Sequence, residues 1–228
     1  DKKGEVEKKS TVSDFLPEEQ NKLSSLSLSM IPVIWNDYKL NFLDLPGGDE
    51  FVGDLNQALE VVKGAVLVID ATKGVEVGTE RVWKEIRKRH IPAVLFINKM
   101  DKENIQFEKL LEDIRTKLGK KAVPFCWPIG RSENFEGFVN VVEMKARIFD
   151  GKESHDAPIW DEKKPKIDEL RSMMLESVAE TSEELLDLYL AGEEIPEEQI
   201  KIGLREGVMN GELTPVIVGS ATKTVGVR

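Results

Sequence analysis

Residues 93–101 read AVLFINKMD, five apolar residues and an asparagine that pass directly into the charged stretch KMD. The part AVLFIN (93–98) shows no alternation of apolar and polar residues, which is typical of a strand buried on both faces. Similar runs occur at 41–44 (NFLD), 65–70 (AVLVID) and 215–220 (PVIVGS). The four runs predict four strands.

Helical patterns separate the first three runs and follow the third. In each pattern the apolar residues share one face of a helix. The three sets are Leu55, Leu59 and Val62; Val82 and Ile86; and Phe107, Leu110, Leu111, Ile114 and Leu118. This alternation of strands and helices predicts an α/β fold built on a parallel, doubly wound sheet.

The composition is that of a globular protein, with 228 residues of which 40% are apolar and 32% charged. The net charge of −10 argues against nucleic-acid binding through diffuse electrostatics, and we expect no sequence-specific binding to nucleic acid. No apolar stretch is long enough to span a bilayer, and the N-terminal DKKGEVEKKS has no hydrophobic signal core. The single cysteine, Cys126, suits a reducing compartment, so we expect a cytoplasmic protein with no membrane partner. The isolated His90 and His155 argue against a His/Cys metal site.

Polar residues stand where each predicted strand ends. They are Asp44; Asp70; Asn98, Lys99 and Asp101; and Ser220, which stands between the small residues Gly219 and Ala221. In open α/β sheets, ligands bind at the carboxyl ends of the strands. Each group alone has an ordinary explanation as a turn or a helix cap. Their recurrence on successive strands favours a ligand site.

The chemistry of these residues suits a guanine base. Guanine offers two adjacent N–H donors, and the carboxylate of Asp101 can accept from both through charge-assisted hydrogen bonds. Asn98 can brace the loop or meet the base with its amide, and the stem of Lys99 can lie along the ring. Ala221, which follows the small Ser220, can present its N–H to the guanine carbonyl oxygen.

The stretch LNFLDLPGGDEF (40–51) suits the phosphate end of a nucleotide. Asp44 can hold Mg²⁺ through water, and Gly47 lacks a Cβ, so its N–H can approach a terminal phosphate closely. With Gly48, these residues form a candidate phosphate-sensing hinge. The alternative is a tight turn after a strand, which also favours glycine.

Three motifs and an insertion carry a resemblance to a known family. The chain resembles the GTP-binding region of the translational GTPases, specifically elongation factor G and its paralogues. The D-x-P-G, N-K-x-D and G-S-A motifs of that family match DLPG (44–47), NKMD (98–101) and GSA (219–221). Residues 124–149 resemble the opening strands of the family's insertion, and residues 182–216 resemble its closing helices.

The resemblance extends from about Asp14 to the end of the chain, and it implies both architecture and function. It implies a P-loop NTPase-like, mostly parallel sheet with helices on both faces, interrupted by an α+β insertion subdomain. The implied activity is that of a ribosome-associated elongation factor that couples GTP hydrolysis to a step of protein synthesis, with GTP or GDP and Mg²⁺ as cofactors. We expect a flexible first-switch and lead-in region at 1–36, a GTP-binding core at 37–120, the insertion at 121–212 and a return to the core at 213–228.

One departure from the family concerns the phosphate-binding loop. No G-x-x-x-x-G-K-[ST] occurs in the sequence, although this loop precedes D-x-P-G in the family. Gly74 and Gly78 have the wrong spacing and no lysine. We therefore expect a fragment cut downstream of the loop, inactive by itself as a GTPase; a natural protein that lost the loop is the alternative.

A second departure lies in the first switch. The family has Arg-Gly-Ile-Thr there, and its threonine ligates Mg²⁺. Counting back from Asp44 without gaps places Ser25 at this threonine, so a hydroxyl for the metal is retained. The alternative is that residues 14–29 form a flexible serine-rich linker or an edge strand.

A third departure is Gly48, which stands where the family has a histidine that positions the attacking water. Glycine has no side chain for this task, and the neighbouring Asp49 and Glu50 carry the wrong charge for work beside a triphosphate. We therefore assign no catalytic residue, and the departure indicates a paralogue of the main elongation factor. The alternative function is a non-hydrolysing nucleotide-binding or protein-interaction module that acts through the acidic insertion.

The insertion has apolar stripes that we interpret as its own core. They are Ile167, Leu170, Met174 and Val178, and Leu185, Leu188 and Tyr189. Its acidic side is interpreted as a solvated face. In the family the corresponding subdomain faces the ribosomal stalk proteins, so the resemblance implies the ribosome and these proteins as partners.

Overall fold

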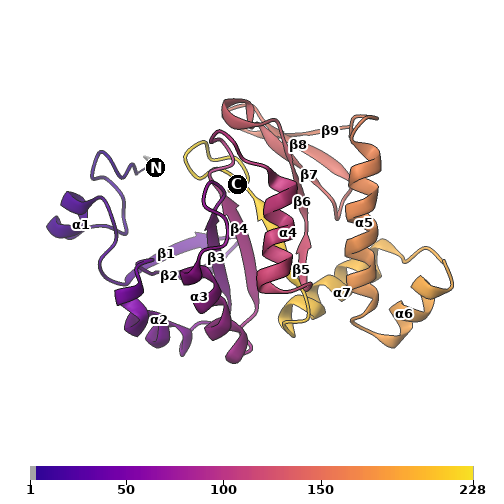
Figure 1. Ribbon diagram of the computed structural model, residues 1–228, viewed down its shortest axis with the longest axis horizontal. Helices are drawn as coiled ribbons and strands as arrows, with labels where there is room; N and C mark the ends of the chain where they lie inside the picture. Colours follow the sequence, from indigo (N-terminus) through magenta and orange to yellow (C-terminus); the bar gives the residue numbers. More distant parts are fainter. Residues whose placement is uncertain (1–3, 228) are drawn as a thin grey trace. The chain divides into compact units, whose positions relative to one another are not determined.

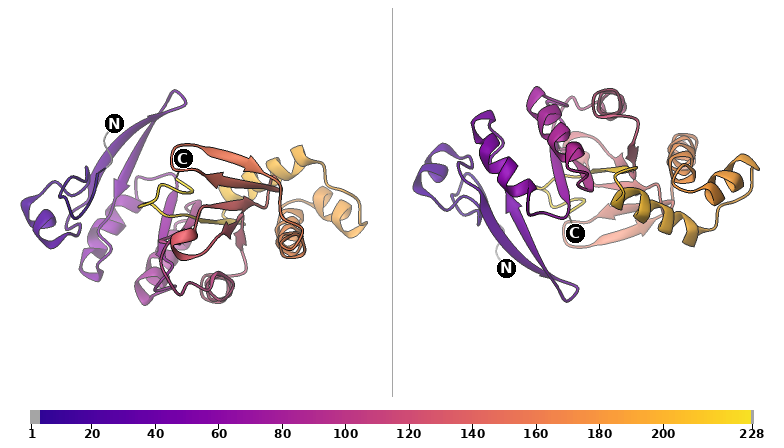
Figure 2. Two further views of the ribbon diagram at one scale, coloured as in Figure 1. Left: turned by 90° about the horizontal axis from the view of Figure 1, so that it is seen from above. Right: turned by 90° about the horizontal axis from the view of Figure 1, so that it is seen from below.

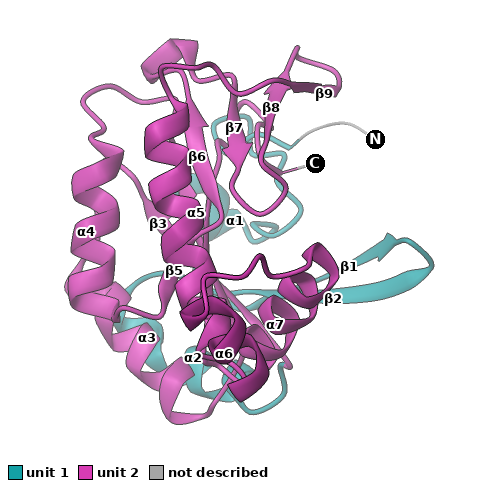
Figure 3. Ribbon diagram, turned by 90° about the vertical axis from the view of Figure 1, so that its right-hand side faces the viewer, with its two compact units in different colours: residues 1–62 teal, residues 63–228 magenta. Residues whose placement is uncertain are grey.

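The computed structural model describes residues 4–227 (Figure 1). The chain divides into two compact units, Asp1–Val62 and Lys63–Arg228, which Figure 3 shows in different colours. Each unit is described by itself. Within the described residues, no helix has the length and apolar character needed to cross a membrane.

Unit 1 is built around a β-hairpin. Its elements are α1 (Pro17–Lys22), β1 (Ser29–Trp35), β2 (Tyr38–Asp44), the 3-10 helix η1 (Asp49–Phe51) and α2 (Val52–Leu59). The hairpin turn consists of Asn36 and Asp37, both with positive φ of 45° and 64°. Two such residues form the turn type that matches the twist of paired strands, and Figure 2 shows the long, narrow hairpin that results.

The position of residues 41–44 differs from the prediction of a buried parallel strand. They end β2, which pairs antiparallel with β1 in a separate two-stranded sheet. Phe42 is 48% exposed, so β2 is not buried on both faces. The two-residue turn explains the difference, because it pairs β2 with the strand directly before it, and an apolar run alone does not specify its partner.

Unit 2 contains the predicted parallel sheet. Its strand order is β3 (Ala65–Asp70), β4 (Ala93–Asn98), β10 (Thr214–Val218) and β5 (Ala122–Pro124), and all neighbours are parallel. The helices α3 (Val77–Lys88) and α4 (Phe107–Leu118) follow β3 and β4. Leu95, Ile97 and Val216 are fully buried, as expected for central strands. The α/β class with a parallel sheet is confirmed.

The stretch between β5 and β10 forms an antiparallel sheet and a group of helices. The sheet contains β6 (Cys126–Ile129), β7 (Gly137–Asn140), β8 (Lys145–Phe149) and β9 (Ser154–Ala157), with the 3-10 helix η2 (Ser132–Asn134) between β6 and β7. The helices are α5 (Lys164–Ala179), α6 (Glu183–Leu190) and α7 (Glu197–Met209). An α+β segment therefore interrupts the parallel sheet.

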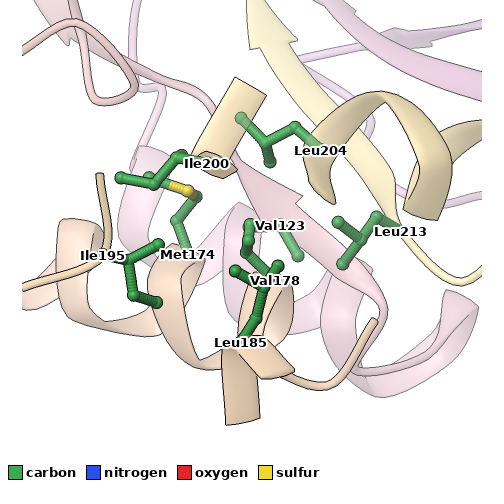
Figure 4. Close-up of a cluster of buried hydrophobic side chains, with 8 residues drawn as sticks. All are labelled: Val123, Met174, Val178, Leu185, Ile195, Ile200, Leu204 and Leu213. Atoms are coloured by element: carbon green, nitrogen blue, oxygen red, sulfur yellow. The ribbon is translucent and has the colours of Figure 1, made fainter. Parts of the chain in front are cut away.

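The helical stripes predicted as core in this segment are confirmed. Figure 4 shows a buried cluster in which α5, α6 and α7 meet β5; its members are Val123, Met174, Val178, Leu185, Ile195, Ile200, Leu204 and Leu213. Ile167 and Leu170 are also buried, while Leu188 and Tyr189 pack against the cluster from its edge. Cys126 is buried in β6, and burial raises the pKa of its thiol to about 12. It is therefore an unreactive core residue.

Candidate functional site

The parallel sheet brings the ends of three strands together. Asp70, at the end of β3, is the register partner of Asn98, at the end of β4. Beyond β10, the N–H of Gly219 donates to Ile97 O at 2.9 Å, and the N–H of Met100 donates to Gly219 O at 3.2 Å. The loops after β4 and β10, where NKMD and GSA lie, are thus joined by backbone hydrogen bonds.

Asn98 connects these two loops through its side chain. Its Oδ1 accepts from the N–H of Lys99 at 2.8 Å and from the N–H of Ala221 at 3.0 Å. Asn98 therefore braces the loops, which is one of the two roles considered for it. The Ala221 N–H considered for a guanine carbonyl is engaged by Asn98, so a ligand oxygen would have to share or replace that bond.

Asp101 has an acceptor atom that the described residues leave unused. Its side chain is only 8% exposed, and its Oδ1 is buried without a hydrogen-bond partner among them. Oδ2 lies 3.9 Å from Nζ of Lys102. A buried acceptor without a partner is unfavourable by about 1–3 kcal/mol, and such a group calls for a specific explanation. A ligand with two adjacent N–H donors, such as guanine, fits this carboxylate.

Lys99 lies beside Asp70. Its Nζ is 2.6 Å from Oδ2 of Asp70, and its backbone is left-handed with φ of 65°. The other oxygen of Asp70 accepts from the N–H and the hydroxyl of Thr72, at 2.9 and 2.6 Å. Burial raises the pKa of Asp70, but the hydrogen bonds from Lys99 and Thr72 outweigh it, and the pKa lies below its ordinary value.

Ser220 shapes the loop after β10. It is fully buried, its hydroxyl accepts from the N–H of Lys223 at 3.1 Å, and it forms a β-bridge with Val225. A Cβ on Gly219 would come within 2.7 Å of the ring of Phe96 and 2.6 Å of Val225 O. Close packing of this loop therefore needs a small residue at 219 and accommodates the small Ser220, whatever the loop binds.

The DLPG residues lie in unit 1, at the end of β2. No described residue donates a hydrogen bond to the carboxylate of Asp44, so its oxygens remain available to water or a hydrated metal ion. Neither Gly47 nor Gly48 has a positive φ, and a Cβ on Gly47 would meet nothing within 4 Å. The fold itself does not require glycine at 47, whereas close approach of a ligand would.

Ser25 also lies in unit 1. Its hydroxyl donates to Oδ1 of the buried Asp14 at 2.7 Å, which leaves oxygen lone pairs for a metal. The nearby Glu19 is fully buried, and its carboxylate accepts from the N–H groups of Leu16 and Leu26 at 3.0 Å each, and from the N–H and hydroxyl of Ser27 at 3.1 Å each. The segment expected to be flexible thus carries a helix and a hydrogen-bonded carboxylate.

Sequence reasoning gave no role to two of these residues. Asp70 belongs to the strand-end groups that favour a ligand site, but the sequence assigns it no specific role, although its place beside Asn98 follows from parallel pairing of two strands that end together. Glu19 gave no signal in the apolar pattern. The signal that was available is the spacing of Leu16 and Glu19, where a glutamate follows a helix start by three residues.

Comparison with known proteins shows one family over the whole chain. Residues 1–228 match the elongation factor Tu GTP-binding domain. Elongation factor G of Thermotoga maritima is 35% identical over 228 residues, and elongation factor G of Thermotoga petrophila is 36% identical over 228 residues. Each alignment covers 99% of this chain and 33% of the relative, so the chain spans about a third of the length of these relatives.

A solved structure agrees with this relationship. The crystal structure of a protein from Thermus thermophilus superposes with a TM-score of 0.91 at 31% sequence identity. The match covers 99% of this chain and 34% of the other.

Proposed function

The chain belongs to the family of the elongation factor Tu GTP-binding domain, and on that premise we propose that it is the guanine-nucleotide-binding part of an elongation factor G-like translation factor. In this proposal NKMD and GSA read the base, and DLPG responds to the terminal phosphate. The complete factor would couple GTP hydrolysis to a step of protein synthesis on the ribosome.

The observation that carries the proposal is the buried, unpartnered Oδ1 of Asp101. Its cost in the free protein is offset when a ligand donates to it. Guanine presents N1–H and N2–H to one carboxylate, whereas adenine presents no such pair. The stem of Lys99 would lie along the base, Asn98 would brace the two loops, and Ser220 would hold Ala221 in place beside the base.

In the same proposal, residues of unit 1 would contact the phosphate end of the nucleotide. Asp44 would hold Mg²⁺ through water, and Ser25 would offer its hydroxyl oxygen. The ion would supply positive charge to the phosphate oxygens. Gly47 and Gly48 would bring their backbone N–H groups close to the terminal phosphate.

The partners and the division of the chain are part of the same proposal. We assign 1–36 to the first-switch region, 37–120 and 213–228 to the GTP-binding core, and 121–212 to the insertion. The insertion would meet the ribosomal stalk proteins, and the place of action would be the cytoplasm. The elongation factor G relatives support the ribosome as the partner.

A second function has one specific observation in its favour. Gly48 stands where the family's water-positioning histidine would be, so a module that binds nucleotide without hydrolysing it efficiently is the alternative. Such a module would act through the acidic insertion.

The test is an NMR titration of the isotope-labelled chain with GDP, ADP and XDP. We expect GDP to shift the amides of Asn98, Lys99 and Asp101 and ADP to leave them unchanged. The sequence contains no G-x-x-x-x-G-K-[ST], so Mg·GTP should show no low-micromolar binding by calorimetry. Tight binding would mean that the phosphate site lies elsewhere.

Asp101→Asn makes the test specific. Asparagine offers one acceptor and one donor, and the donor would oppose a guanine N–H. Charged hydrogen bonds contribute about 1.5–3 kcal/mol each, so GDP affinity should fall at least roughly tenfold. XDP, with a carbonyl in place of the guanine amino group, should lose less. Asp168→Asn, at an exposed position of α5, is the matched control. Wild-type GDP affinity in Asp101→Asn would contradict the proposed function.

A further inference from the structure

The two carboxylate oxygens of Asp70 accept hydrogen bonds from different residues. Oδ1 accepts from the N–H and hydroxyl of Thr72 and closes the turn after β3. Oδ2 accepts from Nζ of Lys99 at 2.6 Å, across 29 positions of sequence. Closing the turn uses only the first oxygen, so the turn alone does not explain the contact with Lys99.

The parallel pairing of β3 and β4 brings Asp70 and Lys99 together. Asp70 and Asn98 are register partners at the ends of two neighbouring parallel strands, and Lys99 is the next residue along. The left-handed backbone of Lys99, with φ of 65°, occurs in a residue type that seldom adopts it. The lysine is therefore held by backbone conformation at one end and by Asp70 at the other.

The surroundings make this pair more ordered than an ordinary surface ion pair. The Asp70 side chain is 18% exposed and accepts hydrogen bonds from three donors, whereas the Lys99 side chain is 48% exposed. Exposed pairs with two mobile partners contribute little, because ordering both side chains is unfavourable. Here one partner is already fixed, so only the lysine has to be ordered.

We propose that Asp70 is a positioning residue for Lys99, which it holds ready to contact a bound purine and its sugar. The proposal rests on the proposed function, in which the stem of Lys99 lies along the base. Because Asp70 orders the lysine before a ligand arrives, the entropy lost on binding is smaller. Asp70 itself need not touch the nucleotide.

Asp70→Asn keeps the contact with Thr72 and changes the contact with Lys99. Asparagine retains an oxygen that can accept from Thr72, so the turn after β3 is preserved. It removes the negative charge and presents an amide to Lys99. We expect the Lys99 side chain to become mobile in NMR relaxation, and the GDP dissociation constant to rise about threefold to tenfold. Affinity for inorganic pyrophosphate should not change, because Lys99 is placed for the base and sugar.

Glu76→Gln is the matched control. It removes the same charge just beyond the same loop, from a side chain 57% exposed and 3.9 Å from Lys73. It should leave the mobility of Lys99 unchanged and GDP affinity within about twofold of wild type.

Three outcomes would overturn the proposal. They are an unchanged GDP affinity in Asp70→Asn, a tighter affinity, which would make Asp70 a competitor for Lys99, and a Lys99 side chain equally mobile in both proteins. If the wild-type chain did not bind GDP even at millimolar concentration, the proposed function would fail separately. The relaxation of Lys99 would then decide whether Asp70 orders it.

Discussion

The backbone N–H of Ala221 donates to Oδ1 of Asn98 across 3.0 Å, although 123 positions of sequence separate the two residues. The same oxygen accepts from the N–H of Lys99. One side chain thus fixes both loops of the proposed base site in the free protein. A site organised before its ligand arrives loses less entropy on binding.

Asn98→Ala should therefore loosen the loop of Ala221. A typical hydrogen bond contributes about 0.5–1.5 kcal/mol, so amide exchange at Ala221 should become roughly twofold to tenfold faster. Hydrogen exchange followed by NMR measures this directly. The exposed Asn210→Ala, after α7, is the control and should leave Ala221 unchanged. Equal exchange in wild type and Asn98→Ala would show that the loop is held by its other bonds, such as the Ser220–Val225 bridge.

Glu19→Gln should loosen the segment between α1 and β1. Glutamine retains one acceptor but lacks the charge that strengthens all four hydrogen bonds to Glu19, and it brings donors into a buried place. Exchange of the Leu26 and Ser27 amides should rise by about tenfold or more. Glu18→Gln, the exposed neighbour, is the control. Unchanged exchange in Glu19→Gln would mean that the segment is held by Asp14 and Ser25 instead.

The same carboxylate predicts a pH dependence. Hydrogen bonds from the N–H groups of Leu26 and Leu16, and from Ser27, hold the pKa of Glu19 below its ordinary value of 4.5. A lowered folded-state pKa stabilises the segment above the unfolded value, and this stabilisation is lost as pH falls through the folded value. Protection of Leu26 should thus be constant above pH 4.5 and decline only below it. In Glu19→Gln this decline should disappear.

Leu23→Gly should stabilise the protein. Leu23 ends α1 with φ of 55°, a left-handed conformation unfavourable for a residue with a Cβ, and its side chain is 46% exposed. Since little packing is lost, relief of the backbone should increase the free energy of unfolding by about 1 kcal/mol. Urea denaturation measures this. Ser24→Gly, whose φ is not positive, should instead be neutral or destabilising, and a destabilised Leu23→Gly would show that the leucine side chain contributes packing.

The sequence predicts some elements to the residue. The apolar runs 65–70 and 93–98 coincide with β3 and β4. The prediction of burial on both faces is wrong for β3, which ends the four-stranded sheet and whose Val66 and Val68 are 57% and 55% exposed. The stripe of α4 is equally plain, since Phe107, Leu110 and Ile114 are buried on one face. In β4 and α4 the local pattern and the tertiary environment agree.

Other features depend on contacts that the local pattern does not record. The run 41–44 does not specify its partner, and the turn at Asn36 and Asp37 pairs it with β1. Glu19 is a charged residue in a polar segment, and only the folded chain brings Leu26 and Ser27 to its carboxylate. At the proposed base site, the sequence indicates NKMD and GSA as the participating motifs, but it does not indicate that Asn98 binds the N–H of Ala221.

The backbone at Gly48 permits a side chain. Gly48 precedes η1 with φ of −75°, an ordinary value for any residue. A Cβ built there would come within 2.6 Å of the Glu50 carboxylate, the mobile end of a side chain that can turn away. A histidine at position 48 is therefore compatible with the conformation of this loop.

Gly48→His should raise the rate of GTP hydrolysis by the complete, ribosome-bound factor without changing its GTP dissociation constant. A group that positions the attacking water acts on the transition state and leaves ground-state binding alone. Positioning and acid–base groups are typically worth about 10²–10⁴-fold, so the wild type should be slower than histidine-bearing relatives, and Gly48→His should recover part of that difference. Single-turnover hydrolysis on ribosomes measures the rate of the wild type and of Gly48→His. Gly53→His is the control, because a Cβ at 53 meets nothing within 4 Å and the residue lies in α2, outside the DLPG motif. A wild-type rate already equal to that of the histidine-bearing relatives would contradict this prediction. It would mean that Asp49, Glu50 or the ribosome positions the water.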